Sequence, residues 1–479
     1  MQRILTNAQM READLYTIEK LGVSEEDLVW RAGRAIVDEI NRRFIGGRVL
    51  VCIGKGNNGA DGTVVAQLLS KTHGFNVNTV NVQNGIFKVF ENDFDIIVDC
   101  IFGTGLNREV EGKYKTAIEL INSSKAFVIS CDIPSGLNGD SGMPMGACVK
   151  ANLTIAIQEF KLGHFINHGK DFCGEVIVKD IGISIWGDDY ITRITPLTAK
   201  KFFLKRPSNV NKGNFGKVSV FGGSKSFPGS VLLSLNGLTA LKMGTGYSNL
   251  AVPNSLTNIY SCINPELTIT SIEDIDGNIL LDTKSLDKLM AYNSIAFGMG
   301  IGVSQEVYKT LSFILQNYKG KLLIDADGIN CLSKFGVDIL KNKSCSVVLT
   351  PHIGEFARLI DTDKQLILRD CVSFAKEFAK KYNVVLILKS NSTIITDGER
   401  VVLNTTGCSG LAKGGSGDVL SGICAGLLAR TNEVFEACCV APYLFGLAGE
   451  YAQKEQNEFT ITATDVINAL PRVINSLDD

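Results

Sequence analysis

The residues best suited to catalysis lie in the stretch Leu411–Gly422, which reads Leu-Ala-Lys-Gly-Gly-Ser-Gly-Asp-Val-Leu-Ser-Gly. Its glycine and serine residues let the backbone approach a ligand closely and turn N–H groups inward. The apolar run Val419–Leu428 follows without a proline and predicts a helix. Unpaired N–H groups at a helix start attract phosphate, or negative charge that develops during a reaction. The stretch therefore predicts an anion hole built from Gly415, Ser416 and Gly417.

A carboxylate stands in the mouth of this anion hole, at Asp418. A fixed negative charge beside bound phosphate is unfavourable unless the carboxylate takes a proton from a reacting group. We therefore interpret Asp418 as a general base. The alternative is a glycine-rich turn in which Asp418 is the helix N-cap.

Three polar loops near the N-terminus each follow an apolar run of strand length. The carboxyl ends of parallel strands share one edge of a sheet, so Asn58, Asp99 and Ser135 are expected to converge there. Their oxygen atoms suit a hard cation. Gly54–Gly62, in the first loop, has an alternative interpretation as a dinucleotide-type turn, although its spacing is not Gly-x-Gly-x-x-Gly.

Loops in the second half also carry reactive residues. His352 lies in a Pro- and Gly-bounded loop directly after a predicted strand, which favours ligand contact over a purely structural role. Glu355 could approach a nucleotide-bound magnesium ion or cap the following helix. Lys389, close to Ser392 and Thr393, could meet phosphate or be a solvated lysine at a strand end.

The elements that position these loops form two α/β series. Helical spacing over Asn7–Arg42 is interrupted near Ser24, which predicts a new N-cap. Buried strands are then expected, separated by segments long enough for crossover helices, and a helix is expected over Thr63–Thr72. The pattern predicts a doubly wound parallel sheet. The expected strands are Arg48–Ile53, Val77–Val82, Asp95–Cys100, Ala126–Cys131, Leu153–Gln158 and Glu175–Val178.

A polar segment between about Asp188 and Asn211 suggests a domain boundary. We place the domains at residues 1–205 and 206–479. The strands expected in the second domain are Lys217–Phe221, Ser248–Val252, Ser294–Phe297, Lys321–Ile324, Ser346–Leu349, Val384–Leu388 and Thr393–Thr396.

Composition narrows the function. The formal net charge of -2 gives no electrostatic argument for nucleic acid or a membrane surface as partner. The N-terminus lacks the apolar core of a targeting segment, and no apolar run is long enough to span a bilayer, so we expect a cytoplasmic protein. The 13 cysteines are scattered and form no Cys-x-x-Cys pair, which indicates buried thiols in a reducing compartment. We also expect a homo-oligomer.

The first half resembles the NAD(P)H-hydrate epimerase family over roughly residues 1–200, through Gly-Lys-Gly-Asn-Asn-Gly-Ala-Asp-Gly, Asp-x-x-Phe-Gly-Thr-Gly-Leu and Asp-Ile-Pro-Ser-Gly-Leu. The resemblance implies a Rossmann-like fold, a potassium ion near Asn58, Asp99 and Ser135, and proton transfer by Asp132. Ala60 stands where the family more often has glycine. The substrate-binding residues implied are Asn57, Asn58, Gly59, Ala60, Asp61, Gly103, Thr104, Gly105, Leu106, Asn107, Arg108, Glu109 and Asp132.

The second half resembles the NAD(P)H-hydrate dehydratase family of the ribokinase-like superfamily over roughly residues 205–479. The motifs are Gly-Gly-Ser with Pro-Gly-Ser, Gly-Met-Gly-Ile-Gly, Thr-Pro-His-Ile-Gly-Glu and Gly-Gly-Ser-Gly-Asp-Val-Leu-Ser-Gly. The resemblance implies a three-layer α/β/α domain. Ser230 replaces a usual alanine, and Asn211 a usual histidine. The hydrated nucleotide would meet Ser230, Gly302, His352 and Asp418, and the adenine nucleotide Lys389, Ser390, Asn391, Ser392, Thr393 and Gly417.

Together the two resemblances imply a bifunctional repair enzyme for hydrated NADH and NADPH. The first domain would interconvert the R and S epimers, and the second would dehydrate the S epimer with cleavage of ADP, carried with magnesium, to AMP and phosphate. ATP is the alternative donor. Other possibilities are a ribokinase-like small-molecule kinase fused to a nucleotide-binding regulatory domain, and a nucleotide-binding scaffold without turnover.

Overall fold

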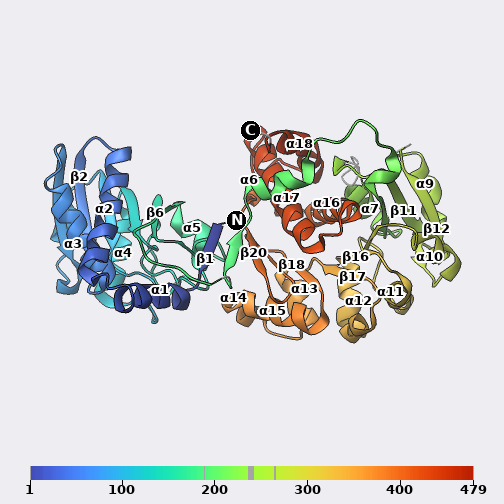
Figure 1. Cartoon of the computed structure of the whole chain (residues 1–479), viewed down its shortest axis with the longest axis horizontal. Helices are drawn as coiled ribbons and strands as arrows, with labels where there is room; N and C mark the ends of the chain where they lie inside the picture. The colour runs from blue at the N-terminus through green and yellow to red at the C-terminus, as the bar shows by residue number, and fades with distance from the viewer. Residues whose placement is uncertain (1, 188, 236–241, 264–265, 478–479) are drawn as a thin grey trace. The chain divides into compact units, whose positions relative to one another are not determined.

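The computed structural model describes residues 2–187, 189–235, 242–263 and 266–477. The chain forms two compact units, shown as a cartoon in Figure 1. The N-terminal unit comprises Arg3–Ile191. The C-terminal unit comprises Thr192–Asp479 together with Met1–Gln2. Each unit is described by itself below.

The N-terminal unit contains a six-stranded sheet in the order β3-β2-β4-β5-β6-β8, and every neighbouring pair is parallel. All six predicted strands are confirmed, with ends shifted by at most two residues. A short parallel pair, β1 (Gln2–Leu5) with β7 (Phe160–Lys161), was not expected. The six strands are β2 (Gly47–Ile53), β3 (Phe75–Asn81), β4 (Ile96–Cys100), β5 (Phe127–Cys131), β6 (Leu153–Ile157) and β8 (Glu175–Lys179).

Helices cover both faces of this sheet, because successive side chains of a strand point to opposite faces. Val49 and Val51 of β2 share a core with α1, α2 and α3, whereas Leu50 and Cys52 share a second core with α4. Both strand faces are therefore apolar, as a doubly wound sheet requires. The helices are α1 (Asn7–Glu19), α2 (Glu25–Arg43), α3 (Asn57–Leu69), α4 (Gly112–Ser123) and α5 (Gly169–Cys173).

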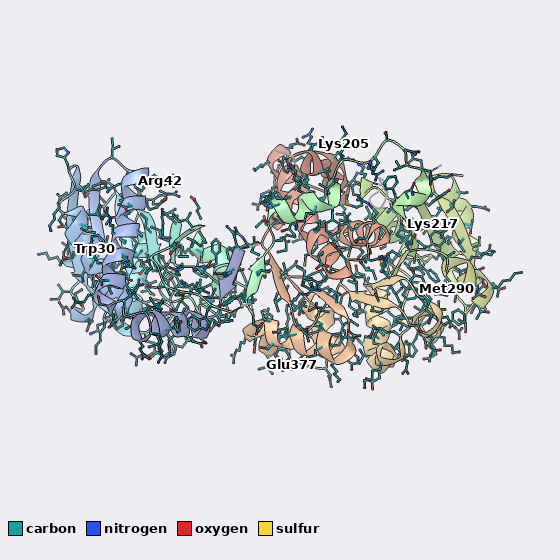
Figure 2. The ribbon with its side chains drawn as sticks, viewed as in Figure 1. Trp30, Arg42, Lys205, Lys217, Met290 and Glu377 are labelled. Carbon is teal, nitrogen blue, oxygen red and sulfur yellow. The ribbon has the colours of Figure 1, made fainter. Side chains whose placement is uncertain are left out.

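The start of α2 confirms the predicted N-cap, since the Ser24 hydroxyl accepts a hydrogen bond from the Asp27 N–H. Three acids in its first turn and two arginines in its last complement the helix dipole. Trp30 and Arg42, labelled in Figure 2, lie on this helix and are largely exposed.

The predicted start of the next helix, at Thr63, was wrong. α3 begins at Asn57, inside the glycine-rich segment, with Gly56 as its N-cap. The helix can start there because glycines permit close backbone approach: a Cβ atom on Gly59 would lie 2.2 Å from the Gly54 carbonyl oxygen. The asparagine and aspartate side chains of the motif are therefore fixed on the first turns of a helix.

The C-terminal unit contains a mixed sheet in the order β12-β11-β10-β15-β16-β17-β18-β19-β20-β9. The strands from β12 to β18 are parallel, and β19 is antiparallel to both of its neighbours. The seven predicted strands are confirmed: β10 (Lys217–Phe221), β11 (Tyr247–Pro253), β15 (Ser294–Phe297), β16 (Lys321–Ile324), β17 (Ser346–Leu349), β18 (Val385–Leu388) and β19 (Thr393–Thr396).

Several strands here were not predicted. β12, β20 and β9 extend the sheet, and their short or alternating sequences gave no unbroken apolar run. A small antiparallel pair also forms outside it. Their bounds are β9 (Ile191–Arg193), β12 (Thr268–Ile272), β13 (Asp274–Ile275), β14 (Asn278–Ile279) and β20 (Val401–Asn404).

Figure 1 shows helix layers on the two faces of this sheet, with α16, α17 and α18 on one face and α11, α12, α13 and α15 on the other. The predicted three-layer α/β/α fold is confirmed. α16 is buried over nearly its whole length against α7 and α17. The helices are α6 (Pro196–Lys200), α7 (Pro228–Leu235), α9 (Thr257–Ser261), α10 (Thr283–Leu289), α11 (Gln305–Asn317), α12 (Asp327–Phe335), α13 (Ile353–Leu359), α14 (Lys364–Arg369), α15 (Cys371–Tyr382), α16 (Ser416–Arg430), α17 (Val434–Glu455) and α18 (Ala463–Asn475).

All 13 cysteines lie in described residues, and none of them forms a disulfide. Every one except Cys262 and Cys408 is buried, which confirms the prediction of buried thiols. Over the described ranges, no helix combines the length and the apolarity that crossing a lipid bilayer requires.

Candidate active sites

A cavity of about 780 Å³ opens in the N-terminal unit beside the loops that follow β2, β4 and β5. Residues of α1 and α2, which were not predicted to take part, complete its wall. Gly59, Ala60 and Glu109 do not line the cavity. The predicted substrate-binding residues that do are Asn57, Asn58, Asp61, Gly103, Thr104, Gly105, Leu106, Asn107, Arg108 and Asp132.

The three predicted cation ligands converge at this edge of the sheet. Asp99 is fully buried and accepts hydrogen bonds from the Ser135 N–H (2.9 Å) and the Ser135 hydroxyl (2.5 Å). The Asn58 amide donates to the Phe102 carbonyl (2.8 Å), while its Oδ1 is buried without a hydrogen-bond partner. Burial raises the pKa of Asp99. An unsatisfied amide oxygen next to a buried carboxylate fits an oxygen-liganded cation.

Asp132 lies directly after β5 with a positive φ of 64°. Its Oδ1 accepts a hydrogen bond from the Ile157 N–H (3.0 Å) and forms an ion pair with the Lys161 ammonium group. Its carbonyl oxygen lies 2.8 Å from His164 Nε2. Neither Lys161 nor His164 was singled out from the sequence. An isolated lysine after a short apolar strand carries no signal that it will be buried.

Two further acids face Asp132. Burial raises the pKa of Asp61, on α3, to about 8 and that of Asp14, on α1, to about 6. Asp61 is therefore mostly protonated at neutral pH, and the cavity contains both neutral and charged carboxyl groups. Neighbouring carboxyl groups with different pKa values are common at sites of proton transfer.

Tight glycine packing holds α3 against the sheet edge. Gly59 approaches the Gly54 carbonyl, as described above, and a Cβ atom on Gly62 would lie 2.7 Å from the Cys100 Cβ. Ala60 is exposed on α3, so its methyl group takes no space from these close approaches.

The Gly59→Ala substitution is therefore expected to lower the free energy of unfolding of the N-terminal unit by about 1–3 kcal/mol. The added methyl group meets backbone, which cannot rotate away. Urea denaturation would measure the loss. Gly105→Ala is the matched control, since its Cβ meets nothing within 4 Å, and its stability should change by less than about 0.5 kcal/mol. Equal effects of the two substitutions would contradict the packing argument.

The second site is built at the carboxyl edge of the parallel strands of the C-terminal unit. The loops after β10, β15, β16, β17 and β18 begin at this edge, close to the start of α16. Gly298, Gly300 and Gly302 all have positive φ angles, which glycine adopts without strain. The Gly302 N–H donates to Asp327 Oδ2 (2.9 Å), which ties this loop to the start of α12.

Asp418 is the third residue of α16, and Gly415 is the N-cap. The alternative in which Asp418 caps the helix is therefore wrong. Burial and the nearby charge of Asp325 raise the pKa of Asp418 to about 7, while the ammonium of Lys389 and a hydrogen bond with the Ser230 side chain act in the opposite direction. A carboxylate with a pKa near neutrality is well suited to general base catalysis.

A buried acid that the sequence did not single out organises this site. Asp325 Oδ1 accepts from the Lys389 ammonium (2.9 Å), and Oδ2 accepts from the Ser421 hydroxyl (2.6 Å). Burial alone would raise the pKa of Asp325, but Lys389 and Ser421 keep that pKa below its usual range. Lys389 is paired and only 20% exposed, so its interpretation as a solvated lysine is wrong. A Cβ atom on Gly417 would lie 3.5 Å from its ammonium nitrogen.

His352 and Glu355 form a capping box at the start of α13. His352 Nδ1 accepts from the Gly354 N–H (3.0 Å) and the Glu355 N–H (3.2 Å), and Glu355 Oε2 accepts from the His352 N–H (2.8 Å). The capping alternative for Glu355 is confirmed. The His352 side chain is still 55% exposed, and a parallel β-bridge pairs the His352 backbone with that of Lys389. Contact of His352 with a ligand stays a prediction.

The remaining predicted nucleotide contacts lie at the turn between β18 and β19: Ser390, Asn391 and Ser392 are in the turn, and Thr393 is the first residue of β19. Ser392 and Thr393 are buried. The Ser390 hydroxyl donates to the Ser392 carbonyl (2.7 Å), which shapes the turn.

Comparisons with known proteins agree with this division into two sites. The family described as NAD(P)H-hydrate dehydratase matches residues 218–472, and the YjeF-related protein N-terminus matches residues 25–88 and 83–163. The bifunctional NAD(P)H-hydrate repair enzyme Nnr of Archaeoglobus fulgidus is 33% identical over 481 residues, which is 95% of each chain. The enzyme of the same name from Coxiella burnetii is 31% identical and covers 99% of this chain and 100% of its own.

Solved structures similar to the C-terminal unit include a dehydratase. The ADP/ATP-dependent NAD(P)H-hydrate dehydratase from Bacillus subtilis, co-crystallised with ATP and Mg²⁺, is 26% identical with a TM-score of 0.52. The alignment covers 60% of this chain and 99% of that one.

Proposed function

The chain belongs to the family of bifunctional NAD(P)H-hydrate repair enzymes, and we propose which of its side chains carry out the two reactions. The N-terminal unit is a NAD(P)H-hydrate epimerase, and the C-terminal unit is an ADP/ATP-dependent NAD(P)H-hydrate dehydratase. The substrate carries a hydroxyl group at C6 of the reduced nicotinamide ring. The observation that supports the dehydratase assignment best is Asp418, poised near neutral pKa in the first turn of α16.

In the dehydratase, Asp418 would remove the proton of the C6 hydroxyl while the hydroxyl oxygen attacks the terminal phosphoryl group of the nucleotide. Hydroxide is a poor leaving group, whereas phosphate leaves readily from C6, and loss of a proton from C5 then restores the C5–C6 double bond of the reduced ring. The N–H groups of Gly415, Ser416 and Gly417 would stabilise the charge that spreads over the phosphoryl group. Asp325 would keep the Lys389 ammonium at the phosphate side of the site.

We propose ADP as the nucleotide, cleaved to AMP and phosphate, with contacts from Lys389–Thr393 and Gly417. Ser230, Gly302 and His352 would contact the hydrated cofactor. In the described part of the chain, no group of three His, Cys, Asp or Glu side chains is arranged to hold a metal ion. We propose that magnesium reaches the site on the nucleotide phosphates, which is its usual mode of binding.

In the epimerase, Asp132 would transfer the proton of the C6 hydroxyl group, with the nucleotide held by the wall residues of the cavity. Asn58, Asp99 and Ser135 would hold potassium, which would supply a fixed positive charge for an anionic group of the substrate. The unpartnered Asn58 Oδ1 supports this assignment. A homo-oligomer and a cytoplasmic location also stay predictions.

A small-molecule kinase of the same superfamily would share the anion hole and would release a stable phosphoester. Incubation with hydrated NADH plus ADP or ATP separates the two, with absorbance recovery and inorganic phosphate followed together. Equal yields of NADH and phosphate are expected. A phosphoester that accumulates without recovery of NADH would reject the dehydratase assignment of these residues.

The dehydratase rate should depend on pH through Asp418. A general base acts when it is ionised, and the pKa of Asp418 is raised to about 7. At saturating substrate, the rate is therefore expected to be low at pH 5–6, to rise through about pH 7 and to level off above about pH 8. Initial rates in a constant-ionic-strength buffer series would test this. A flat profile across this range would contradict the role of Asp418.

The Ser230→Ala substitution provides a matched test of the same titration. Its hydroxyl group lowers the pKa of Asp418, so its loss should raise the midpoint of the profile by roughly 0.5–1 pH unit. The rate at pH 6.5 should fall while the rate at pH 9 changes little. An unchanged midpoint would mean that the Ser230 hydroxyl does not act on Asp418 during turnover.

A further inference from the structure

Asp132 has an unusual backbone conformation for a residue with a Cβ atom. Its φ of 64° lies in the left-handed region, which is unfavourable for an L-residue. Asp132 leaves β5 through this conformation and its N–H donates to the Ile155 carbonyl of β6 (2.8 Å). The carboxylate is 16% exposed and faces the cavity. Such a conformation persists only where surrounding contacts maintain it.

Besides the contacts with β6, Asp132 is held by one short segment, β7 with the 3₁₀ turn Leu162–His164. Lys161 is buried, with 1% of its side chain exposed, and its ammonium group contacts Asp132 Oδ1 and the Ile157 carbonyl (2.7 Å). His164 Nδ1 accepts from the Lys161 N–H (3.1 Å), so Nε2 carries the proton and donates to the Asp132 carbonyl. Burial lowers the pKa of His164 to about 4, so the ring is neutral.

The two oxygen atoms of the Asp132 carboxylate are thereby made different. Oδ1 accepts from the Ile157 N–H and from Lys161. Within the described ranges, no hydrogen bond reaches Oδ2. Oδ1 is therefore committed to the protein, and Oδ2 is free to accept a proton.

We infer that Lys161 and His164 are positioning residues of the epimerase. His164 holds the left-handed backbone of Asp132, and Lys161 holds Oδ1 and the negative charge of the carboxylate. Oδ2 alone is therefore presented to the substrate hydroxyl. The inference rests on the proposed role of Asp132. In the reaction, Oδ2 takes the proton of the C6 hydroxyl as the C6–N1 bond breaks, which leaves a carbonyl group at C6 and the electron pair on N1. N1 then attacks the other face of the carbonyl, the C6–N1 bond re-forms with the opposite configuration, and Oδ2 returns the proton to the C6 oxygen. Neither Lys161 nor His164 gains or loses a proton.

Lys161 is the cation that contacts the Asp132 carboxylate. Besides Lys161 and His164, the titratable groups that face Asp132 are Asp61 on α3, Asp14 on α1 and Cys131 of β5. His164 is neutral, and none of the other three groups is a cation. Replacing Lys161 by an uncharged side chain removes the cation that contacts Asp132.

The test measures epimer exchange against pH in Lys161→Met, Lys161→Arg, His164→Leu, His164→Gln and Asp132→Asn proteins. Lys161→Met is expected to lower kcat about 10- to 100-fold and to move the acid limb of the kcat profile upward by roughly 1–3 pH units. Lys161→Arg keeps the charge and should leave the acid limb in place. His164→Gln, which can still donate to the Asp132 carbonyl, should retain more activity than His164→Leu. Lys150→Met, at an exposed lysine away from the cavity, is the control and should match wild type.

The outcomes separate the inference from the proposed function. Exchange that survives in Asp132→Asn rejects the role of Asp132 itself. If Asp132→Asn is inactive while folded Lys161→Met keeps the wild-type kcat and acid limb, the inference is overturned and the base assignment stands. A lower kcat with an unmoved acid limb also overturns it, because a merely structural lysine would give that result. Circular dichroism and thermal melts identify folded variants, and Lys161→Arg provides the comparison if Lys161→Met does not fold.

Discussion

The Asp418→Asn protein is expected to bind ADP and hydrated NADH but to dehydrate the S epimer about 10²- to 10⁴-fold more slowly than wild type. The amide keeps the size of the side chain and the first turn of α16, so the anion hole and the paired Lys389 should remain in place. The substitution removes only the group that can accept the hydroxyl proton. The loss should therefore appear in kcat rather than in nucleotide affinity.

Two measurements make this result decisive. Single-turnover release of phosphate from ADP reports the chemical step, and equilibrium binding of ADP reports the integrity of the site. Epimer exchange in the N-terminal unit is the internal control for the preparation. Near-normal turnover of Asp418→Asn would reject Asp418 as the base. Loss of ADP binding would instead indicate that Asp418 mainly organises the start of α16.

The Asp132→Asn protein should lose epimer exchange by about 10²- to 10⁴-fold while it dehydrates pure S substrate at the wild-type rate. The asparagine can still accept from Lys161 and from the Ile157 N–H through its carbonyl oxygen, so the cavity should keep its shape. It lacks the second carboxylate oxygen, which is the proposed proton acceptor.

Chromatography of the two epimers over time measures the exchange directly. With ADP present, wild-type protein should consume an R and S mixture completely, whereas Asp132→Asn should consume S quickly and R only at the rate of spontaneous exchange. Enzymatic conversion of R in this variant would refute the assignment. Slow dehydration of pure S substrate would show that the substitution affects more than the epimerase.

Local sequence determined much of the architecture. Unbroken apolar runs followed by glycine and polar residues correctly predicted six strands of the N-terminal sheet and seven of the C-terminal sheet, because strands buried on both faces have few alternatives. The loops at their carboxyl ends were correctly placed for the same reason. Strands with short or alternating sequences, such as Thr268–Ile272 and Val401–Asn404, were missed since they lack that pattern.

The sequence also placed Asp418 correctly, in the first turn of a buried helix that follows a glycine loop, and it indicated the family through ordered motifs. It did not place the start of α3. Residues with low intrinsic helix propensity form its first turn, because close packing of Gly59 on Gly54 and of Gly62 on Cys100 compensates. That packing depends on where β2 and β4 end in space.

What only the tertiary structure decided is the set of groups that act on the two proposed bases. Lys161 and His164 follow Asp132 by 29 and 32 positions, and Asp325 precedes its partner Ser421 by 96. Parallel sheets bring such distant positions to one edge, and burial then strengthens their interactions by removing water. Sequence alone therefore predicted Asp418 as a reactive carboxylate from its local motif and Asp132 through the family resemblance. The fold decided the pKa of Asp418 and which oxygen of Asp132 is free to react.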